Sequence, residues 1–243
     1  MHRPLALLEA DPVLRRLTDP RRTGTRPSPL PVRDPAALRR TLAVKRAIDF
    51  VFAAALLVLS APVLAAAALL VKLTSRGPAL YSQERVGQFG RVFVIYKLRS
   101  MYHQCERLTG PRWSTPGDPR VTPVGKVLRA LHLDELPQLV NVLRGQMSLI
   151  GPRPERPEIA TQLGRAIPDY DVRSAVLPGI SGHAQVHLPP DSCVRSVKNK
   201  LVYDLFYIRS RTWAMELFIL LATGLKMFGL KRLYYRAPRV PTE

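Results

Sequence analysis

Two adjacent acids, Asp134 and Glu135 in "LHLDELPQLVNVLRG", are the residues of this basic chain best suited to chemistry. A carboxylate can ligate magnesium, or attack an activated phosphorus as a nucleophile. On a continuous helix, neighbouring side chains point about 100° apart, so the pair is not a site by itself. A helix cap is the competing interpretation: Asp134 would be the N-cap, Glu135 would complement the helix dipole, and Pro137 would lie in the first turn. Spacing alone favours the cap.

Basic side chains around the pair favour a site. Arg129 precedes the acids, Arg144 and Arg153 follow them, and Lys97 and Arg99 lie in the predicted strand "VIYKLRS". Guanidinium groups whose position is fixed bind phosphate oxygens in pairs of hydrogen bonds. Each of these residues alone could be a solvated surface charge, but the set predicts a phosphate-handling site. The loop "PGISGHAQV" adds little, because it is neither a P-loop nor a GxGxxG pattern.

The charge balance implies an anionic partner. Lys and Arg number 37 against 18 Asp and Glu, which gives a formal net charge of +19. Nucleic acid, anionic lipid and a phosphorylated substrate all fit such a surplus. Cys105 and Cys193 have no disulfide or metal-site spacing, so we expect two free thiols.

Residues 1–40 are rich in proline and arginine, which predicts a disordered basic tail in solvent or at a membrane surface. We expect residues 236–243 to form a second short tail. The chemistry is therefore expected between these two segments.

Residues 50–71 form a run of 22 residues without a charge, long enough to cross a hydrocarbon core of about 30 Å. Pro62 removes a backbone hydrogen bond near the middle, and the Ser60 hydroxyl could satisfy a freed carbonyl. Four basic residues lie just before the run and three just after, so the charges do not indicate which flank of the run is cytoplasmic. A re-entrant helix over residues 41–73, a spanning helix and a buried soluble helix all stay open on these grounds.

The following region alternates short elements. "ALYSQERV" and "RVFVIYKL" read as strands joined by a turn at Gly87 and Gly90. A helix is expected after Pro123, and another over residues 134–144, ended by Gly145.

The segment "TWAMELFILLATGLKMFGLKRLYYR" is apolar but contains Glu216 and Lys226. It predicts an interfacial amphipathic helix, with Trp213, Tyr234 and Tyr235 in the headgroup zone. A core helix of a soluble domain is the alternative.

Several strings, in order, resemble the bacterial sugar transferases, the monotopic polyprenyl-phosphate phosphoglycosyl transferases. They are "KRAIDFVFAAALLVLSAP", "GPALYSQERVGQFGRVFVIYKLRSM", "DPRVTPVGKVLRALHLDELPQLVNVLRGQMSLIGPRP" and "LPGISGHAQV". The resemblance covers roughly residues 42–228. Gln146 stands where this family commonly has Asp, and Ser181 and His183 replace its usual Thr and Trp.

This resemblance implies an α-rich α+β monotopic membrane protein. Its re-entrant helix (residues 41–73) would bend at Ser60 and Pro62, and residues 74–235 would form the sugar transferase domain. That domain would combine interfacial amphipathic helices with a small cytoplasmic α/β catalytic portion. The expected location is the bacterial inner membrane, with the catalytic face cytoplasmic, on an anionic surface.

The resemblance also implies a reaction. A sugar 1-phosphate would pass from a UDP-type nucleotide sugar to polyprenyl (undecaprenyl) phosphate through a covalent phosphosugar–aspartate intermediate. That step initiates exopolysaccharide, O-antigen or glycoconjugate synthesis. Asp134 would be the nucleophile and the ligand of Mg²⁺, and Glu135 would accept a proton or orient the acceptor phosphate. Lys97, Arg129 and Arg153 would bind phosphate oxygens.

Two other function classes compete with this one. A membrane-tethered nucleic-acid-binding or scaffold protein would also account for the charge, but no DNA- or RNA-binding motif supports it, so we expect no nucleic-acid partner. An inactive transferase used for assembly is the other alternative, and the intact acid pair argues against it. A homodimer is an alternative to a monomer. The donor sugar cannot be read from the sequence.

Overall fold

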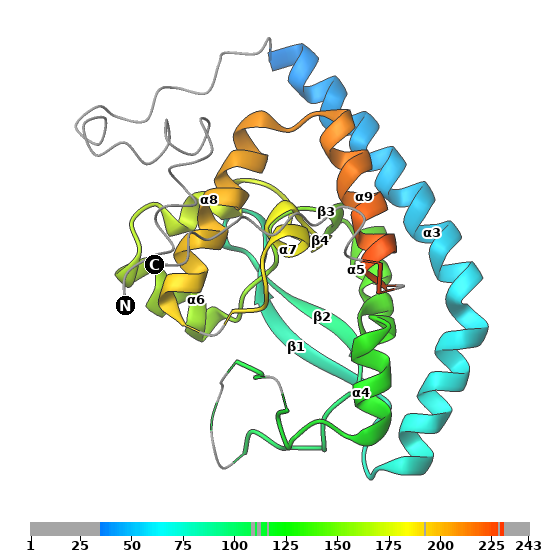
Figure 1. Ribbon diagram of the computed structural model, residues 1–243. Helices are drawn as coiled ribbons and strands as arrows, with labels where there is room; N and C mark the ends of the chain where they lie inside the picture. Colours follow the sequence, from blue (N-terminus) through cyan, green and yellow to red (C-terminus); the bar gives the residue numbers. More distant parts are fainter. Residues whose placement is uncertain are drawn as a thin grey trace.

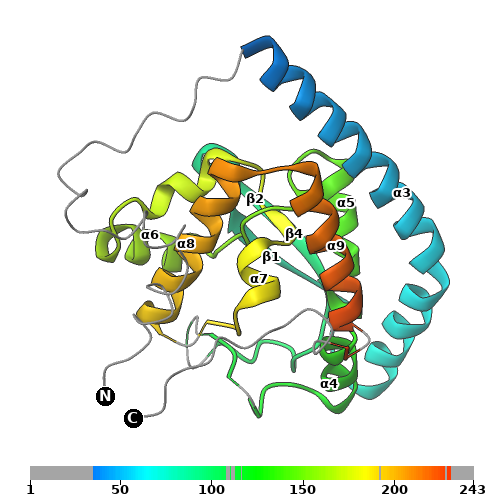
Figure 2. The same ribbon diagram turned by 45° about the horizontal axis from the view of Figure 1, so that its top comes forward.

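The computed structural model describes residues 35–107, 110, 113–115, 117–191, 193–227 and 229–230. A long helix, α3 (Pro35–Thr74), bows around one side of an α+β body, as Figures 1 and 2 show. On its inner side lie α9 (Trp213–Met227), α5 (Leu139–Leu143) and α4 (Pro123–Ala130). The far side of the body carries α6 (Pro157–Ala166), the 3₁₀-helix η4 (Tyr170–Ala175) and α8 (Val194–Ser210).

Helix α3 is long and apolar enough to cross a membrane, and only 11% of its most apolar stretch is buried. Val58 and Leu59 are largely exposed, whereas Ala53 and Val71 pack on the body. This exposure excludes the buried soluble helix. Pro62 lies inside the continuous helix, and the Ser60 hydroxyl donates to the Leu57 carbonyl at 3.4 Å. The re-entrant course of α3 in a membrane stays a prediction.

The helix begins at Pro35, so residues 35–40 are helical and not part of a tail. The reason is local: Pro35 suits a first helical turn, and "AALRRTLA" after it contains no further proline. The remainder of the predicted tails, at residues 1–34 and 236–243, lies outside the described residues, as do Tyr234 and Tyr235.

A β-hairpin forms the middle of the body. Strands β1 (Leu80–Val86) and β2 (Val92–Leu98) pair antiparallel, and the turn contains η2 (Gln88–Gly90), in which Gly90 has a φ of 76°. Phe93 and Ile95 point into the core. Lys97 follows on the same face, since side chains alternate along a strand. The predicted strands and turn are confirmed.

The acid pair lies inside a 3₁₀-helix, η3 (Leu133–Gln138), and not at the start of an α-helix. Its first flanking residue, His132, is left-handed (φ 54°), and no side chain caps the element. The cap interpretation of Asp134 is therefore wrong. The helix predicted for residues 134–144 is divided into η3 and α5, and Gly145 (φ 78°) ends it as expected.

A short parallel pair completes the body. Strand β3 (Ser148–Ile150) lies beside β4 (Gly179–Ser181), and α7 (His183–His187) follows. A Cβ on Gly179 would lie 2.0 Å from the Gly151 nitrogen, so only glycine allows this approach. The main core, which contains Val142, Met147, Ile150, Tyr207 and Ile219, surrounds this pair. Cys105 and Cys193 are not joined in a disulfide.

Buried polar contacts fasten both ends of α3 to the body. Towards its start, Lys45 pairs with Glu216 of α9 at 2.6 Å, and Ser148 donates to Asp49 at 2.7 Å. At its end, the buried Arg99 side chain donates to three carbonyls of residues 71, 75 and 76. Since Glu216 faces inward, α9 exposes its apolar residues, among them Trp213, Leu217, Phe218 and Leu221. Helix α9 is thus amphipathic, with its charged side towards the protein.

Candidate active site

Strand β2, η3 and the loop over residues 151–156 bring three of the predicted site residues together. The Glu135 carboxylate accepts from Lys97 Nζ at 2.8 Å through Oε1. Arg153 Nη1 donates to Oε2 at 3.2 Å, and its Nη2 donates to Oε1. Both oxygens of Glu135 are therefore engaged by cations from two other elements.

Glu135 is held in its ionised form. Burial opposes that form, but Arg153 and Lys97 outweigh it and hold the pKa of Glu135 well below its usual value. The side chains of Glu135 and Lys97 are 14% and 16% exposed, while that of Arg153 is 41% exposed. Arg153 is thus the cation of this group most open to a ligand.

Asp134 contrasts with its neighbour. It is buried, with 6% of its surface exposed, yet its carboxylate has no hydrogen bond or ion pair to any residue that the structure describes. Burial, followed by the charge of Glu135, raises the pKa of Asp134 against the opposing effect of Lys97, Arg129 and Arg153. A buried carboxylate without a partner is costly, so its oxygens are suited to a reacting or coordinating role.

Arg129 lies near the acids but is bound elsewhere. Its Nε donates to Ser100 Oγ and its Nη1 to Ser114 Oγ, both at 2.9 Å. Two neutral hydroxyls position the guanidinium, and no described residue forms an ion pair with it, which suits a phosphate contact. The other arginines of the predicted set do not join the site: Arg99 caps α3, and Arg144 stacks on the Tyr96 ring.

Asn141 is a site-supporting residue that the sequence reasoning missed. Its fully buried amide accepts from Tyr96 N at 3.3 Å and donates to the Val94 carbonyl at 2.7 Å, which fixes β2, and with it Lys97, against α5. It also donates to Gln146 Oε1 at 2.8 Å. Gln146, which stands where the family commonly has Asp, therefore takes part in a structural contact. A lone asparagine in the apolar run "QLVNVL" was the available signal.

A second group of contacts fixes the backbone of Arg153. Arg173 Nη2 donates to the Arg153 carbonyl at 2.8 Å and to Asp204 at 2.9 Å. Arg85 donates to the Pro154 carbonyl at 3.3 Å. These contacts hold the loop that presents Arg153 to Glu135.

A magnesium ion at this site would depend on the substrate. Within the described part of the chain, no three His, Cys, Asp or Glu side chains gather to hold a metal. Magnesium commonly binds through one or two carboxylates together with substrate phosphates and water. The unpartnered Asp134 carboxylate fits this pattern as the ligand from the protein.

The chain is similar to known proteins over most of its length. Residues 40–229 match the sequence pattern of a family described as "Bacterial sugar transferase". The chain is 43% identical over 180 residues to the UDP-N-acetylgalactosamine-undecaprenyl-phosphate N-acetylgalactosaminephosphotransferase of Aeromonas hydrophila. These 180 residues cover 74% of this chain and 42% of the relative.

Two further relatives differ in length. The undecaprenyl-phosphate glucose phosphotransferase of Komagataeibacter xylinus is 42% identical, over 74% of this chain and 35% of its own. The exopolysaccharide production protein PSS of Rhizobium leguminosarum bv. phaseoli is 35% identical, over 75% of this chain and 94% of its own. The chain thus spans less than half the length of the first two relatives.

Proposed function

The chain belongs to the bacterial sugar transferase family, and from this premise we propose that it transfers a sugar 1-phosphate from a UDP-sugar to undecaprenyl phosphate. The names of two relatives contain undecaprenyl phosphate, and one of them contains a UDP-sugar. The product would be a lipid-linked sugar that initiates an exopolysaccharide or related glycoconjugate. The observation that carries the proposal is the free, buried Asp134 carboxylate beside the Lys97–Glu135–Arg153 cluster.

The reaction needs two displacements at one phosphorus. An Asp134 oxygen attacks the sugar-bearing phosphorus, the bond from that phosphorus to the bridging oxygen breaks, and UMP leaves with the electron pair. A phosphate oxygen of the lipid then attacks the same phosphorus and releases Asp134. A covalent intermediate lets a soluble and a lipid substrate use one site in turn. Phosphoryl transfer depends mainly on positioning and charge neutralisation, which Lys97, Arg129 and Arg153 provide.

Of the two roles expected for Glu135, orientation has the better support. Its low pKa makes it a weak proton acceptor at neutral pH. The lipid phosphate is already an anion and needs no base. Glu135 instead holds Lys97 and Arg153 where they meet the phosphates.

We also propose magnesium as the cofactor, with Asp134 as its ligand from the protein. When bound, the ion would neutralise the diphosphate as a Lewis acid. The cations of the site would orient the same oxygens, Lys97 from β2 and Arg153 from the loop after β3.

For the membrane arrangement we propose that α3 enters and leaves one leaflet, at the cytoplasmic face of the inner membrane. Both ends of α3 are tied to the same body, through Lys45 at one end and Arg99 at the other. A helix that crosses the bilayer would place those ends on opposite sides. The basic charge of the chain suits an anionic surface. Tags at residues 1 and 243 should report the same side, and opposite sides would rule this arrangement out. A homodimer stays a prediction.

The activity is tested with detergent-purified chain, undecaprenyl phosphate, Mg²⁺ and a panel of sugar nucleotides. We expect UMP release from at least one UDP-sugar, and none from the Asp134→Asn variant. The Aeromonas relative with UDP-N-acetylgalactosamine is the positive control. If the control turns over and this chain releases no UMP from any UDP-sugar, the proposed function is wrong.

A further inference from the structure

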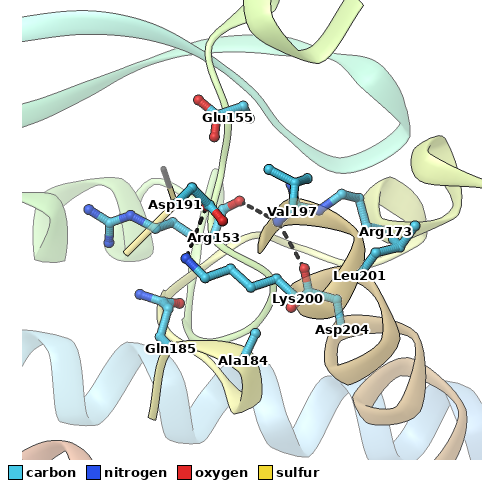
Figure 3. Close-up of a pocket in the computed structure, with 10 residues that line it drawn as sticks. All are labelled: Arg153, Glu155, Arg173, Ala184, Gln185, Asp191, Val197, Lys200, Leu201 and Asp204. Atoms are coloured by element: carbon cyan, nitrogen blue, oxygen red, sulfur yellow. Dashed lines mark hydrogen bonds and ion pairs between the residues drawn. The ribbon is translucent and has the colours of Figure 1, made fainter. Parts of the chain in front are cut away.

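The two arginines that are proposed to bind phosphate, Arg153 and Arg129, are held by different parts of the fold. Arg173 holds the Arg153 backbone carbonyl, beside a small polar pocket that Figure 3 shows. This pocket has a volume of about 20 Å³, room for about one water, and its charges are paired. Arg153 is thus held by contacts around its own loop, whereas Arg129, in α4, depends on the loop that joins β2 to α4.

The loop between β2 and α4 is closed at its base and folded around a buried ion pair. Met101 and Val121 form an antiparallel bridge, and Tyr102 N donates to the Arg120 carbonyl at 2.9 Å. The Arg120 guanidinium donates through Nε and Nη2 to the two oxygens of Asp118, at 2.6 to 3.1 Å. The two side chains are 7% and 3% exposed. These contacts fix the described part of the loop.

The same loop is tied to the segment that contains Arg153. The Glu106 carboxylate accepts from Arg156 Nη1 at 2.9 and 3.1 Å, and from Arg120 Nη1 at 3.4 Å. Arg156 lies three residues after Arg153 in the chain. One carboxylate of the loop therefore joins it to the other side of the candidate site.

Ser114 connects the buried ion pair to Arg129. Its hydroxyl donates to Asp118 Oδ2 at 3.3 Å and accepts from Arg129 Nη1 at 2.9 Å. Hydrogen bonds from Arg120 hold the pKa of Asp118 well below its usual value, so Asp118 is ionised and accepts at neutral pH. Because a hydroxyl has one proton and two lone pairs, Ser114 can donate to Asp118 and still accept from Arg129.

Arg129 itself is held at two of its three guanidinium nitrogens. Ser100 Oγ accepts from Nε and Ser114 Oγ from Nη1, both at 2.9 Å. No described residue accepts from Nη2, so the two serines fix the plane of the guanidinium and leave Nη2 to a ligand. Burial raises the pKa of Asp134, and Arg129 is one of the cations that oppose this increase. Arg129 therefore lies close to the proposed nucleophile.

We propose that Ser114 is a positioning residue for the transfer, which holds the Arg129 guanidinium where Nη2 meets a phosphate oxygen of the substrate. The proposal rests on the proposed function, in which Arg129 binds phosphate. A guanidinium with a fixed plane loses less freedom on binding an anion than one that is free to turn. Loss of the Ser114 hydroxyl should therefore reduce turnover without unfolding the chain.

The test compares two backgrounds, the wild type and Arg129→Lys, in the UMP-release assay. In the wild type, Ser114→Ala should lower kcat/KM about tenfold, the loss expected for one hydrogen bond to a charged group. Arg129→Lys keeps a positive charge and therefore measurable turnover, but it lacks the Nη1 atom that Ser114 holds. In that background Ser114→Ala should change kcat/KM by less than about twofold, because the two residues act as a unit.

Two further variants separate this role from a general effect on the loop. Ser114→Thr keeps the hydroxyl and should recover most of the turnover that Ser114→Ala loses. The matched control is Thr115→Val, which removes the neighbouring hydroxyl; this hydroxyl has no hydrogen bond to a described residue, so kcat/KM should not change. Thermal unfolding of each variant identifies any that is misfolded. If Ser114→Ala is misfolded, Ser114→Cys replaces it, since a thiol is a much weaker acceptor of similar size.

Three results would overturn the proposal. One is an equal loss from Ser114→Ala in both backgrounds, which would mean that Ser114 does not act through Arg129. The others are no loss in the wild-type background, and a Ser114→Thr variant with a normal Tm that does not recover turnover. If the proposed function itself is wrong, the result is different: the wild type releases no UMP, and this proposal fails with it.

Discussion

Neutralising Glu135 and neutralising Asp134 should have different effects on the stability of the fold. Glu135→Gln should destabilise the fold by about 3 kcal/mol, since removal of one partner of a buried ion pair costs about 3–5 kcal/mol and glutamine keeps one acceptor oxygen. The buried partner here is Lys97, at 16% exposure. Arg153 is 41% exposed, so its pair adds no more than about 1 kcal/mol. For a chain of this length, 3 kcal/mol corresponds to a fall in Tm of about 6–12 °C.

Asp134→Asn should leave the stability unchanged or slightly higher, and abolish UMP release. The folded state raises the pKa of Asp134, so near neutral pH the charged form is disfavoured by folding, and a neutral side chain removes that cost. The variant loses no hydrogen bond or ion pair to a described residue, because none is formed with this carboxylate. We thus expect Asp134→Asn to lose activity while it keeps its stability, and the adjacent Glu135→Gln to lose stability.

Thermal unfolding and UMP release, measured on the same detergent preparations, check both expectations. The pKa of Glu135 is lowered by folding, so its stabilisation is present above the usual glutamate pKa of about 4.3 and is lost as the pH falls through the folded-state value. The difference in Tm between wild type and Glu135→Gln should therefore narrow in acid. Lys97→Met in the Glu135→Gln background should restore part of the Tm. A Tm loss in Asp134→Asn as large as in Glu135→Gln would refute this reasoning.

Four further expectations concern two structural contacts, the metal and the pH dependence of the reaction. Arg99→Met should lower stability by about 3 kcal/mol in thermal unfolding, because three carbonyls at the end of α3 lose a charged donor. Gly125→Ala should lower it by about 3 kcal/mol and reduce the yield of folded protein, since a Cβ would lie 1.9 Å from the Ser100 carbonyl oxygen; a normal Tm would contradict that close approach. Chelation with EDTA should stop UMP release, and added Mg²⁺ should restore it; full activity in EDTA would exclude the metal. The rate of UMP release at limiting donor should fall on acidification at a pH above the ordinary aspartate pKa of about 3.9, because Asp134 must be ionised and its pKa is raised.

The sequence predicted the local elements well. The alternation in "RVFVIYKL" and the glycines before it identified the hairpin, and this placed Lys97 on a face that turns towards the acids. The helix after Pro123 is confirmed as α4, and Gly145 ends α5. These features depend on neighbours within a few residues, which a sequence displays directly.

The errors and omissions have a different physical origin. The interpretation of Asp134 as a helix cap failed because His132 adopts a left-handed conformation. This conformation is uncommon outside glycine, and no sequence pattern predicted it here. The partners of Glu216 and Asn141 lie far away in the chain: Lys45 is 171 positions from Glu216, and Val94 is 47 from Asn141. Such contacts depend on how the elements pack, and sequence spacing contains no record of it.

The 3₁₀ geometry of η3 explains how adjacent acids take separate roles. With about three residues per turn, neighbouring side chains project roughly 120° apart, so Glu135 reaches Lys97 and Arg153 while Asp134 does not. Together with Arg129, the five side chains carry three positive and two negative charges, a net charge of +1. This sum already includes the Asp134 anion, and both proposed substrates are phosphates, so one net positive charge cannot neutralise the donor diphosphate in a buried setting. A divalent cation held by Asp134 would supply the missing charge, and Asp134 is the carboxylate of the pair that no described residue engages.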